Sequence, residues 1–248
     1  MKTIQSIKRL VLLIITFLII LFACQKENTG AKVTDNEQAD SLVTKPQYNN
    51  TSFGVYKGVV VGSTGTIVFT INNGDNVLKG YLTIDNTKDT LSTTQTIVPG
   101  QPINNVTFTG RISSMTLSAN ADGSNATLTN VSITGHSNVA VLIIHENSTK
   151  QILCYEGTYS GNRSGTLNCV RVGVNNGDTV YVLAQFNDTL TLQRYGQVIN
   201  NNTSINFGPV FGIQGGFSGN NFNGTWTWAD FNTGTIIDSG TFACTRTY

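Results

Sequence analysis

The stretch TIVFTINNGDNVLKGYLTI, residues 66–84, holds the pattern that decides the fold. Two runs of β-branched and aromatic residues, 66–71 and 78–84, flank the sequence NNGD at residues 72–75. Such runs favour strands, and an Asn-Gly step favours a tight turn because both residues tolerate a positive φ angle. The stretch therefore predicts two antiparallel strands joined by a hairpin.

The same pattern continues over residues 53–248. Short apolar runs alternate with turn residues such as Asp122-Gly123 and Asn176-Gly177, and no apolar pattern persists at helical spacing. Turns every 8–12 residues or so are typical of antiparallel sandwiches and barrels. The sequence therefore predicts an all-β protein.

The chain also repeats itself at an offset of 103 residues. An ungapped alignment of residues 54–77 with 157–180 gives 9 identities in 24 positions, among them Tyr56 with Tyr159 and both NNGD sequences. A fixed-offset match of this kind indicates internal duplication. We predict that Tyr56 and Tyr159 occupy equivalent positions in two repeated units.

The repeat predicts two tandem antiparallel β-barrels or β-sandwiches, at residues 53–150 and 151–248. Each unit of nearly 100 residues offers about eight short apolar runs, which suits a small barrel. Whether the units form separate barrels or one sandwich stays open at this point. A membrane barrel is disfavoured, because runs such as residues 116–126 are too polar for a lipid-facing strand.

Charge is scarce in this sequence. Asp, Glu, Lys and Arg make up 12% of the 248 residues, against roughly 25% in typical soluble proteins. Asn and Thr together supply about a quarter of the chain, and the formal net charge is +1. A nearly neutral chain gives no support for nucleic-acid binding.

The N-terminus has the organisation of an export signal. Lys2, Lys8 and Arg9 precede an apolar run at residues 10–23, which is shorter than the 20 or so residues of a membrane span. The run ends directly before Cys24.

The sequence Leu21-Phe22-Ala23-Cys24 resembles the lipobox of Gram-negative bacterial lipoproteins. Leu21 and Ala23 match that pattern, whereas Phe22 is bulkier than the usual residue there. The body of the chain resembles uncharacterised β-rich envelope lipoproteins, whereas the lipobox resemblance covers only the leader. It implies that residues 1–23 are removed and that Cys24 carries a lipid, which would anchor the protein to the outer membrane. The membrane face, periplasmic or external, stays open.

Residues 24–52 are predicted to form a flexible linker after the lipidated Cys24. Charged and small polar residues dominate it, and it has too few apolar residues to offset the entropy lost on ordering.

The residues that commonly carry chemistry are few. His136 and His145 are the only histidines, and their spacing to the cysteines matches no zinc motif. No nucleophile motif is present, so we predict no catalytic residue, metal or cofactor. A carboxylate pair of the glycosidase kind stays open, because such pairs converge in space rather than in sequence.

The aromatic cluster in residues 222–228 is a candidate binding surface. Phe222, Trp226 and Trp228 share one face of a predicted strand, where they could stack on sugar rings. The competing interpretation, which we favour, is that both tryptophans fill the core of the second unit.

Three cysteines remain after Cys24, and an oxidising compartment would favour pairing two of them. Cys169 and Cys244 share a pattern, with an apolar residue two positions before and an arginine two positions after. We predict a Cys169–Cys244 disulfide and leave Cys154 as the free thiol.

These features favour a non-catalytic, lipid-anchored envelope protein that displays two β-domains to bind a glycan, a peptide or an envelope protein. The alternatives are a hydrolase with an unrecognised carboxylate site and a purely structural surface protein. The discriminating features are an exposed aromatic platform, a cleft with two carboxyls, or filled barrels without a cleft.

Overall fold

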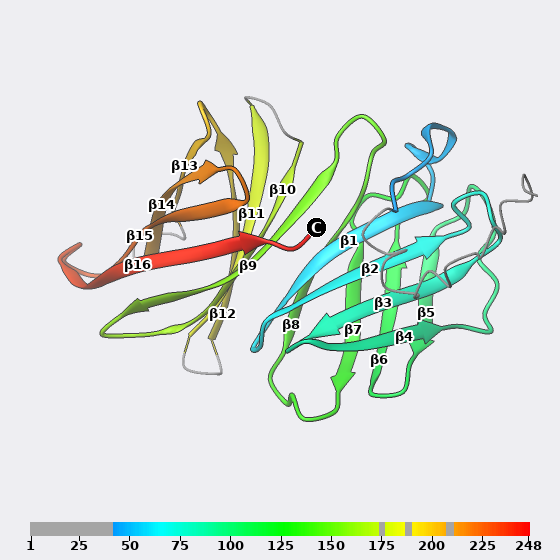
Figure 1. Ribbon diagram of the computed structural model, residues 1–248, viewed down its shortest axis with the longest axis horizontal. Helices are drawn as coiled ribbons and strands as arrows, with labels where there is room; N and C mark the ends of the chain where they lie inside the picture. The colour runs from blue at the N-terminus through cyan, green and yellow to red at the C-terminus, as the bar shows by residue number, and fades with distance from the viewer. Residues whose placement is uncertain (1–41, 174–176, 187–189, 207–210) are drawn as a thin grey trace, which may run out of the picture. The chain divides into compact units, whose positions relative to one another are not determined.

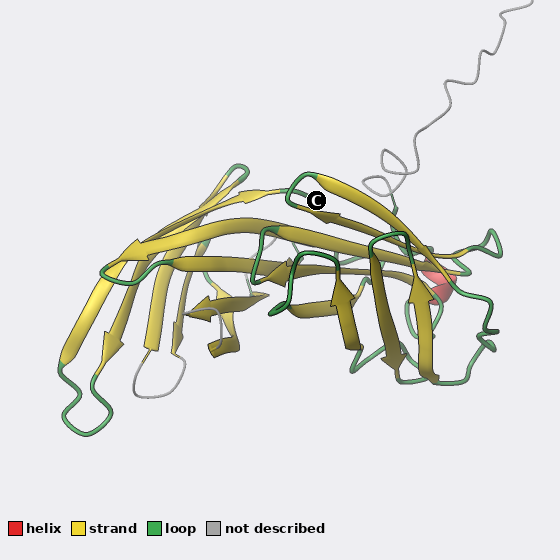
Figure 2. Ribbon diagram, turned by 90° about the horizontal axis from the view of Figure 1, so that it is seen from below, coloured by secondary structure: helices red, strands yellow, loops and turns green. Residues whose placement is uncertain are grey.

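The computed structural model describes residues 42–173, 177–186, 190–206 and 211–248, and all of them lie in one compact unit (Figure 1). Its regular elements are strands, apart from one turn of 3-10 helix, η1 (Pro46–Tyr48), as Figure 2 shows. The all-β prediction is confirmed. Cys24 and the leader, residues 1–23, lie outside the described residues.

The first sheet holds eight antiparallel strands in the order β7-β6-β5-β4-β3-β2-β1-β8. Their bounds are β1 (Gly54–Val61), β2 (Gly65–Ile71), β3 (Leu78–Ile84), β4 (Thr87–Ser92), β5 (Ile103–Thr109), β6 (Ser113–Ala119), β7 (Thr127–Ile133) and β8 (Ala140–His145).

The second sheet also holds eight antiparallel strands, in the order β12-β11-β10-β9-β16-β15-β14-β13. Their bounds are β9 (Ile152–Gly161), β10 (Gly165–Val172), β11 (Asp178–Phe186), β12 (Leu190–Val198), β13 (Asn202–Asn206), β14 (Phe211–Ser218), β15 (Asn221–Ala229) and β16 (Ile236–Arg246).

Both sheets are nearly closed up-and-down barrels with the same connectivity. In each, strands adjacent in the chain pair with one another at every step but one, and the first strand also pairs with the last: β1 with β8, and β9 with β16. The barrels differ in where the ladder is interrupted, which we call the seam. The seam lies between β7 and β8 in the first barrel and between β12 and β13 in the second.

The interior of each barrel is filled by inward-facing apolar side chains. The first core is built around residues such as Tyr56, Phe69 and Phe108, and the second around residues such as Tyr159 and Trp226. Since successive strand residues face opposite sides, the alternating apolar positions of the sequence become these two cores.

A third apolar cluster joins the two barrels. Val59 and Val61 on the outer face of β1 pack with Cys154 of β9, Val170 of β10 and Leu183 of β11. Strand β1 is therefore buried on both faces, which explains its unbroken apolar run at residues 59–61.

Several polar side chains bond to backbone groups at this junction. The buried Asn168 side chain donates to Val60 O and accepts from Gly157 N (2.9 Å). Gln185 Nε2 donates to Asn138 O (2.7 Å), and Thr166 Oγ1 accepts from Gly62 N (3.1 Å). Paired in this way, the buried amides fix the register of one barrel on the other.

The segment from residue 42 to 52 is ordered, which corrects its assignment to the flexible linker. Thr44 is buried: its backbone N–H donates to Glu146 Oε2 (3.1 Å), and its Oγ1 accepts from Val55 N (2.8 Å). Together with Tyr48, which packs against the first core, these contacts hold a segment that has few apolar residues.

Tyr56 and Tyr159 both lie on the first strand of their barrel and are both buried in its core. Their registers differ, because Tyr56 pairs with Phe69 whereas Tyr159 pairs with Gly165 beside the hairpin turn. The expected equivalence therefore holds for the strand and for the core, but not for the position along the strand.

Candidate functional site

The aromatic cluster of β15 is core rather than surface. Phe222 and Trp226 are each 0% exposed, and Trp226 Nε1 donates to Ser160 O (3.1 Å). The ring of Trp226 contacts those of Tyr159 and Phe211. The favoured core interpretation is thus confirmed for Phe222 and Trp226, and the alternative, a stacking platform, is wrong for them because neither ring can reach a ligand.

Trp228 is half-buried and already covered. The Arg163 guanidinium lies 4.6 Å from its ring centroid, and Arg163 Nε also lies 3.8 Å from Asp238. The Trp228 ring also contacts the rings of Phe186 and Phe211. Its indole face is therefore occupied by the protein itself.

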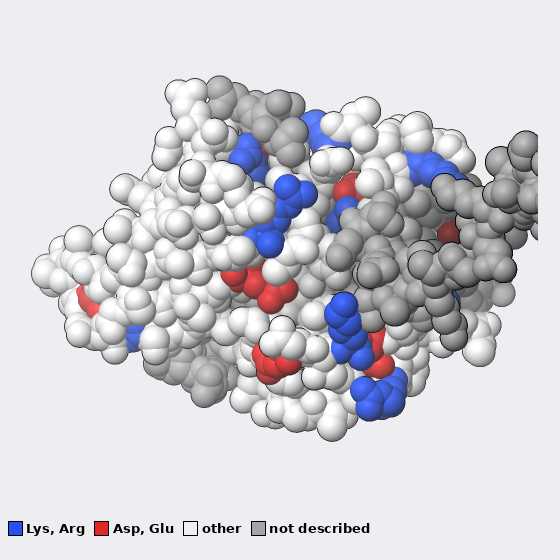
Figure 3. Space-filling view, in the orientation of Figure 1, with Lys and Arg blue, Asp and Glu red and all other residues white. Residues whose placement is uncertain are grey.

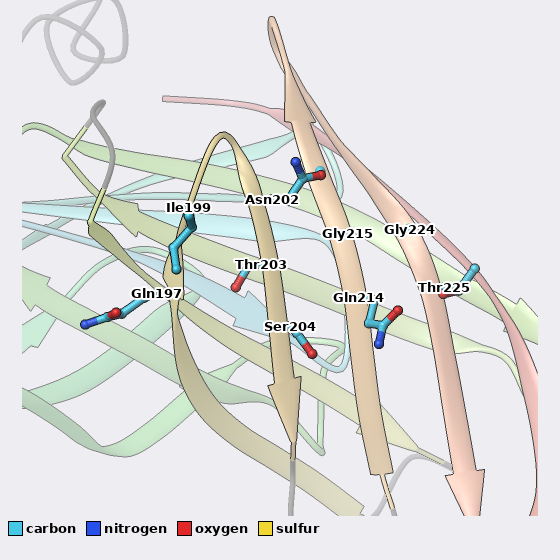
Figure 4. A pocket seen from close by; sticks show the side chains of 10 residues that line it. Gln197, Ile199, Asn202, Thr203, Ser204, Gln214, Gly215, Gly224 and Thr225 are labelled. Atoms are coloured by element: carbon cyan, nitrogen blue, oxygen red, sulfur yellow. The ribbon is translucent and has the colours of Figure 1, made fainter.

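A groove of about 810 Å³ lies on the outer face of the second barrel, beside the β12–β13 seam (Figure 4). Its lining comes from β12 to β15 and from the turn between β12 and β13. The lining residues are Gln197, Ile199, Asn202, Thr203, Ser204, Gln214, Gly215, Gly216, Gly224 and Thr225.

Strand register places polar side chains of the groove in a row. Ser204 pairs with Gln214, which pairs with Thr225, so the three residues stand side by side on the outer face. All three are exposed. Neighbouring strands lie about 4.8 Å apart, so the row offers a hydrogen-bonding group at regular intervals.

Glycine keeps the floor of the groove low. Gly216 lies on the outer face between Asn202 and Asn223, and a Cβ there would come within 2.9 Å of Asn202 Oδ1. Gly215 and Gly224 pair with each other, and the Phe242 ring lies against both of them on the inner face. The groove thus exposes backbone between polar walls.

None of the described residues that line the groove is titratable. On the face that Figure 3 shows, charged side chains likewise form only a few small groups among uncharged residues. A groove of this kind can donate and accept hydrogen bonds but offers neither a general acid nor a general base.

The histidines have structural surroundings. His145 Nε2 lies 2.8 Å from Phe53 O, and its ring packs on Tyr56 at 4.7 Å between centroids. Burial lowers the pKa of His145, so it is neutral at pH 7. His136 lies 3.6 Å from Asp85. Within the described residues, no three His, Cys, Asp or Glu side chains converge as a metal site would require.

The three cysteines are buried free thiols, which corrects the predicted Cys169–Cys244 disulfide. Both residues face the second core, but β9 lies between their strands β10 and β16. Two strand spacings amount to about 9–10 Å, beyond the 4.4–6.8 Å or so between Cα atoms that a disulfide allows. Cys244 Sγ donates instead to Leu167 O (3.2 Å).

Two carboxylates line a small cleft of about 250 Å³ between the barrels. Hydrogen bonds from Ser63, above all, lower the pKa of Asp85, whereas burial raises the pKa of Glu156. Sequence reasoning did not identify this pair, because the two residues are far apart in the chain and neither lies in a motif.

No protein-family model, no curated protein and no solved structure matches the chain. Among the described residues, no helix is long and apolar enough to span a membrane. The fold and the surface features described above characterise the chain as a tandem β-barrel protein with a polar groove and a small cleft.

Proposed function

We propose that the chain is a lipid-anchored cell-envelope protein that binds a neutral glycan without transforming it. The observation that carries this proposal is the groove beside the β12–β13 seam, whose described lining consists of amides, hydroxyls, glycine backbone and Ile199, with no charged group among them. Such a lining complements a ligand that is rich in hydroxyls and carries no charge.

The chemistry of the groove favours a sugar over a peptide. Ser204, Gln214 and Thr225 supply both donors and acceptors, which suits hydroxyl groups that also do both. A peptide would need apolar pockets for its side chains, and among the described lining residues Ile199 alone is large and apolar. A charged ligand would lose its hydration without gaining a counter-charge.

Anchoring rests on the leader. A lipid on Cys24 would hold the barrels at the membrane through residues 25–41, because each buried methylene contributes about 0.8 kcal/mol. Metabolic labelling with a fatty-acid probe tests this: the wild-type chain should be labelled and Cys24→Ser should not. Label that persists on the variant would contradict the anchor.

Glycan binding is tested by screening the purified protein on a glycan array and measuring hits by calorimetry. Gln214→Ala should weaken binding about three- to tenfold, since a neutral hydrogen bond contributes about 0.5–1.5 kcal/mol. Gln101→Ala, an exposed glutamine of the first barrel, is the matched control and should bind as the wild type does. If glycan binding is unchanged in both Gln214→Ala and Thr225→Val, the groove is not the binding site.

A hydrolase is the second candidate, favoured by the cleft that holds Asp85 and Glu156. Two carboxyls whose environments push their pKa values apart suit a general acid and a general base. Hydrolysis of glycan hits, abolished by Glu156→Gln and unaffected by Gln214→Ala, would support this candidate. Absence of both binding and hydrolysis would favour the structural alternative.

A further inference from the structure

A second hollow lies at the seam of the first barrel. Strand β7 does not pair with β8 there, and a cavity of about 600 Å³ opens between this seam and the outer face of the second barrel. Its walls come from the segment after η1, the β6–β7 turn, β8, β11 and β12. Both barrels therefore contribute to one cavity.

The second barrel supplies an aromatic wall. Tyr181 of β11 lines the cavity and is half-buried, with its inner side packed on the cluster that joins the barrels. Tyr195 of β12 pairs with Tyr181 and is 70% exposed, and the two ring centroids lie 5.8 Å apart. This is the exposed aromatic platform that β15 does not provide.

The first barrel supplies polar groups with unused hydrogen-bonding capacity. Asp122 Oδ1 accepts from Ser124 N (2.9 Å) and Oγ (2.7 Å), which leaves Oδ2 without a partner among the described residues. Asn147 Oδ1 accepts from Thr149 N (3.0 Å), and its Nδ2 likewise has no described partner. Gln193 of β12 adds an exposed amide to the lining.

The polar side of the cavity is held in place by buried contacts. Gly123 has a positive φ of 83° and lies so close to the His145 ring and Thr51 O that a Cβ would clash with both. Asn49 and Ser148 join the flanking segments by two hydrogen bonds of 2.9 and 2.8 Å. A site positioned before binding loses less entropy when the ligand arrives.

We propose that this cavity is a second carbohydrate site, which takes one neutral pyranose ring stacked on Tyr181 with its hydroxyls bonded by Asp122 and Asn147. An aromatic face suits the C–H face of a sugar, a carboxylate accepts from its hydroxyls, and amides bond the remainder. Hydrogen bonds from Ser124 lower the pKa of Asp122, so the acceptor is ionised at neutral pH. The site is distinct from the groove beside the β12–β13 seam and does not depend on it.

Saturation-transfer NMR and calorimetry on the full chain test the site, with methyl pyranosides of glucose, galactose, mannose and N-acetylglucosamine as probes. At least one should bind, with transfer strongest on its ring C–H protons. Tyr181→Leu keeps an apolar residue against the junction and should weaken binding at least tenfold. Asp122→Asn should also weaken it, whereas Gln214→Ala should bind the probe as the wild type does.

The outcomes separate this site from the groove. If Tyr181→Leu and Asp122→Asn both bind the probe as the wild type does, the second carbohydrate site is refuted. It is also refuted if only Gln214→Ala loses binding. Either result leaves the groove proposal intact. Failure of all four pyranosides to bind would overturn the second carbohydrate site as well. A thermal melt of each variant shows whether it is folded; if Tyr181→Leu is not, the exposed Asp122→Asn decides the question.

Discussion

The buried ion pair between Lys57 and Glu146 offers the sharpest test of how the fold is held together. Lys57 Nζ lies 2.8 Å from Glu146 Oε1, and the two side chains are 6% and 0% exposed. Glu146 also accepts from Ile152 N (3.0 Å) and Thr44 N (3.1 Å). One carboxylate thus connects β1, the segment before it and the start of the second barrel.

The magnitude follows from what each substitution leaves behind. Glu146→Gln leaves the buried ammonium of Lys57 without a counter-charge, and breaking a buried pair in this way costs about 3–5 kcal/mol. Lys57→Met leaves a carboxylate that keeps two backbone donors, so we expect about 3 kcal/mol, the lower end of that range. The double variant buries neither charge and should be less destabilised than the sum of the singles by about 1–3 kcal/mol.

Urea unfolding of the purified full chain measures these free energies. Both tryptophans belong to the second barrel, so fluorescence reports that barrel, whereas far-UV circular dichroism reports both. Lys88→Met removes an exposed lysine and should change stability by no more than about 0.5 kcal/mol. A coupling energy below about 0.5 kcal/mol would refute the reasoning, because the two charges would then not depend on each other.

Three further predictions concern single residues. Trp226→Ala should lower the free energy of unfolding by about 3–5 kcal/mol in the same assay; a smaller loss with retained structure would place the indole outside the core. Burial raises the pKa of the Cys154 thiol to about 12, so Ellman's reagent at pH 8 should label it only after unfolding, and rapid native labelling would contradict its burial. Burial raises the pKa of Asp89, but hydrogen bonds from Ser113 and nearby backbone N–H groups outweigh this effect and lower it overall. Its stabilisation should therefore be complete above its unfolded pKa of about 3.9 and disappear as the pH falls through the lower folded value; an Asp89→Asn variant with unchanged acid unfolding would contradict this.

Much of the architecture was predictable because it depends on local patterns. Alternating apolar residues and Asn-Gly turns specify antiparallel strands, and the expected division near residue 150 falls between the end of β8 at His145 and the start of β9 at Ile152. The run of three valines at residues 59–61 also predicts the junction between the barrels, although the sequence analysis drew no conclusion from it. An apolar run without alternation indicates a strand buried on both faces, which is what the junction requires.

Contacts between distant strands could not be read in the same way. The Cys169–Cys244 pairing fails because β9 lies between the two strands, and that neighbour is set by closure of the barrel rather than by either local sequence. The residues of the two hollows were missed for the same reason. Tyr181 and Asp122 belong to different barrels, and no spacing in the sequence relates them.

The two hollows share a structural cause. Over the described residues, both barrel interiors hold clusters of large buried side chains, where other barrels keep a cavity for a ligand. An interrupted ladder, by contrast, separates two strands and exposes the surfaces beside them. The groove lies at the β12–β13 seam and the junction cavity at the β7–β8 seam, although the seams occupy different places in two barrels of the same connectivity. Since the hollow follows the seam in each barrel, a substitution that extended pairing across a seam should close the adjacent hollow and leave the other open.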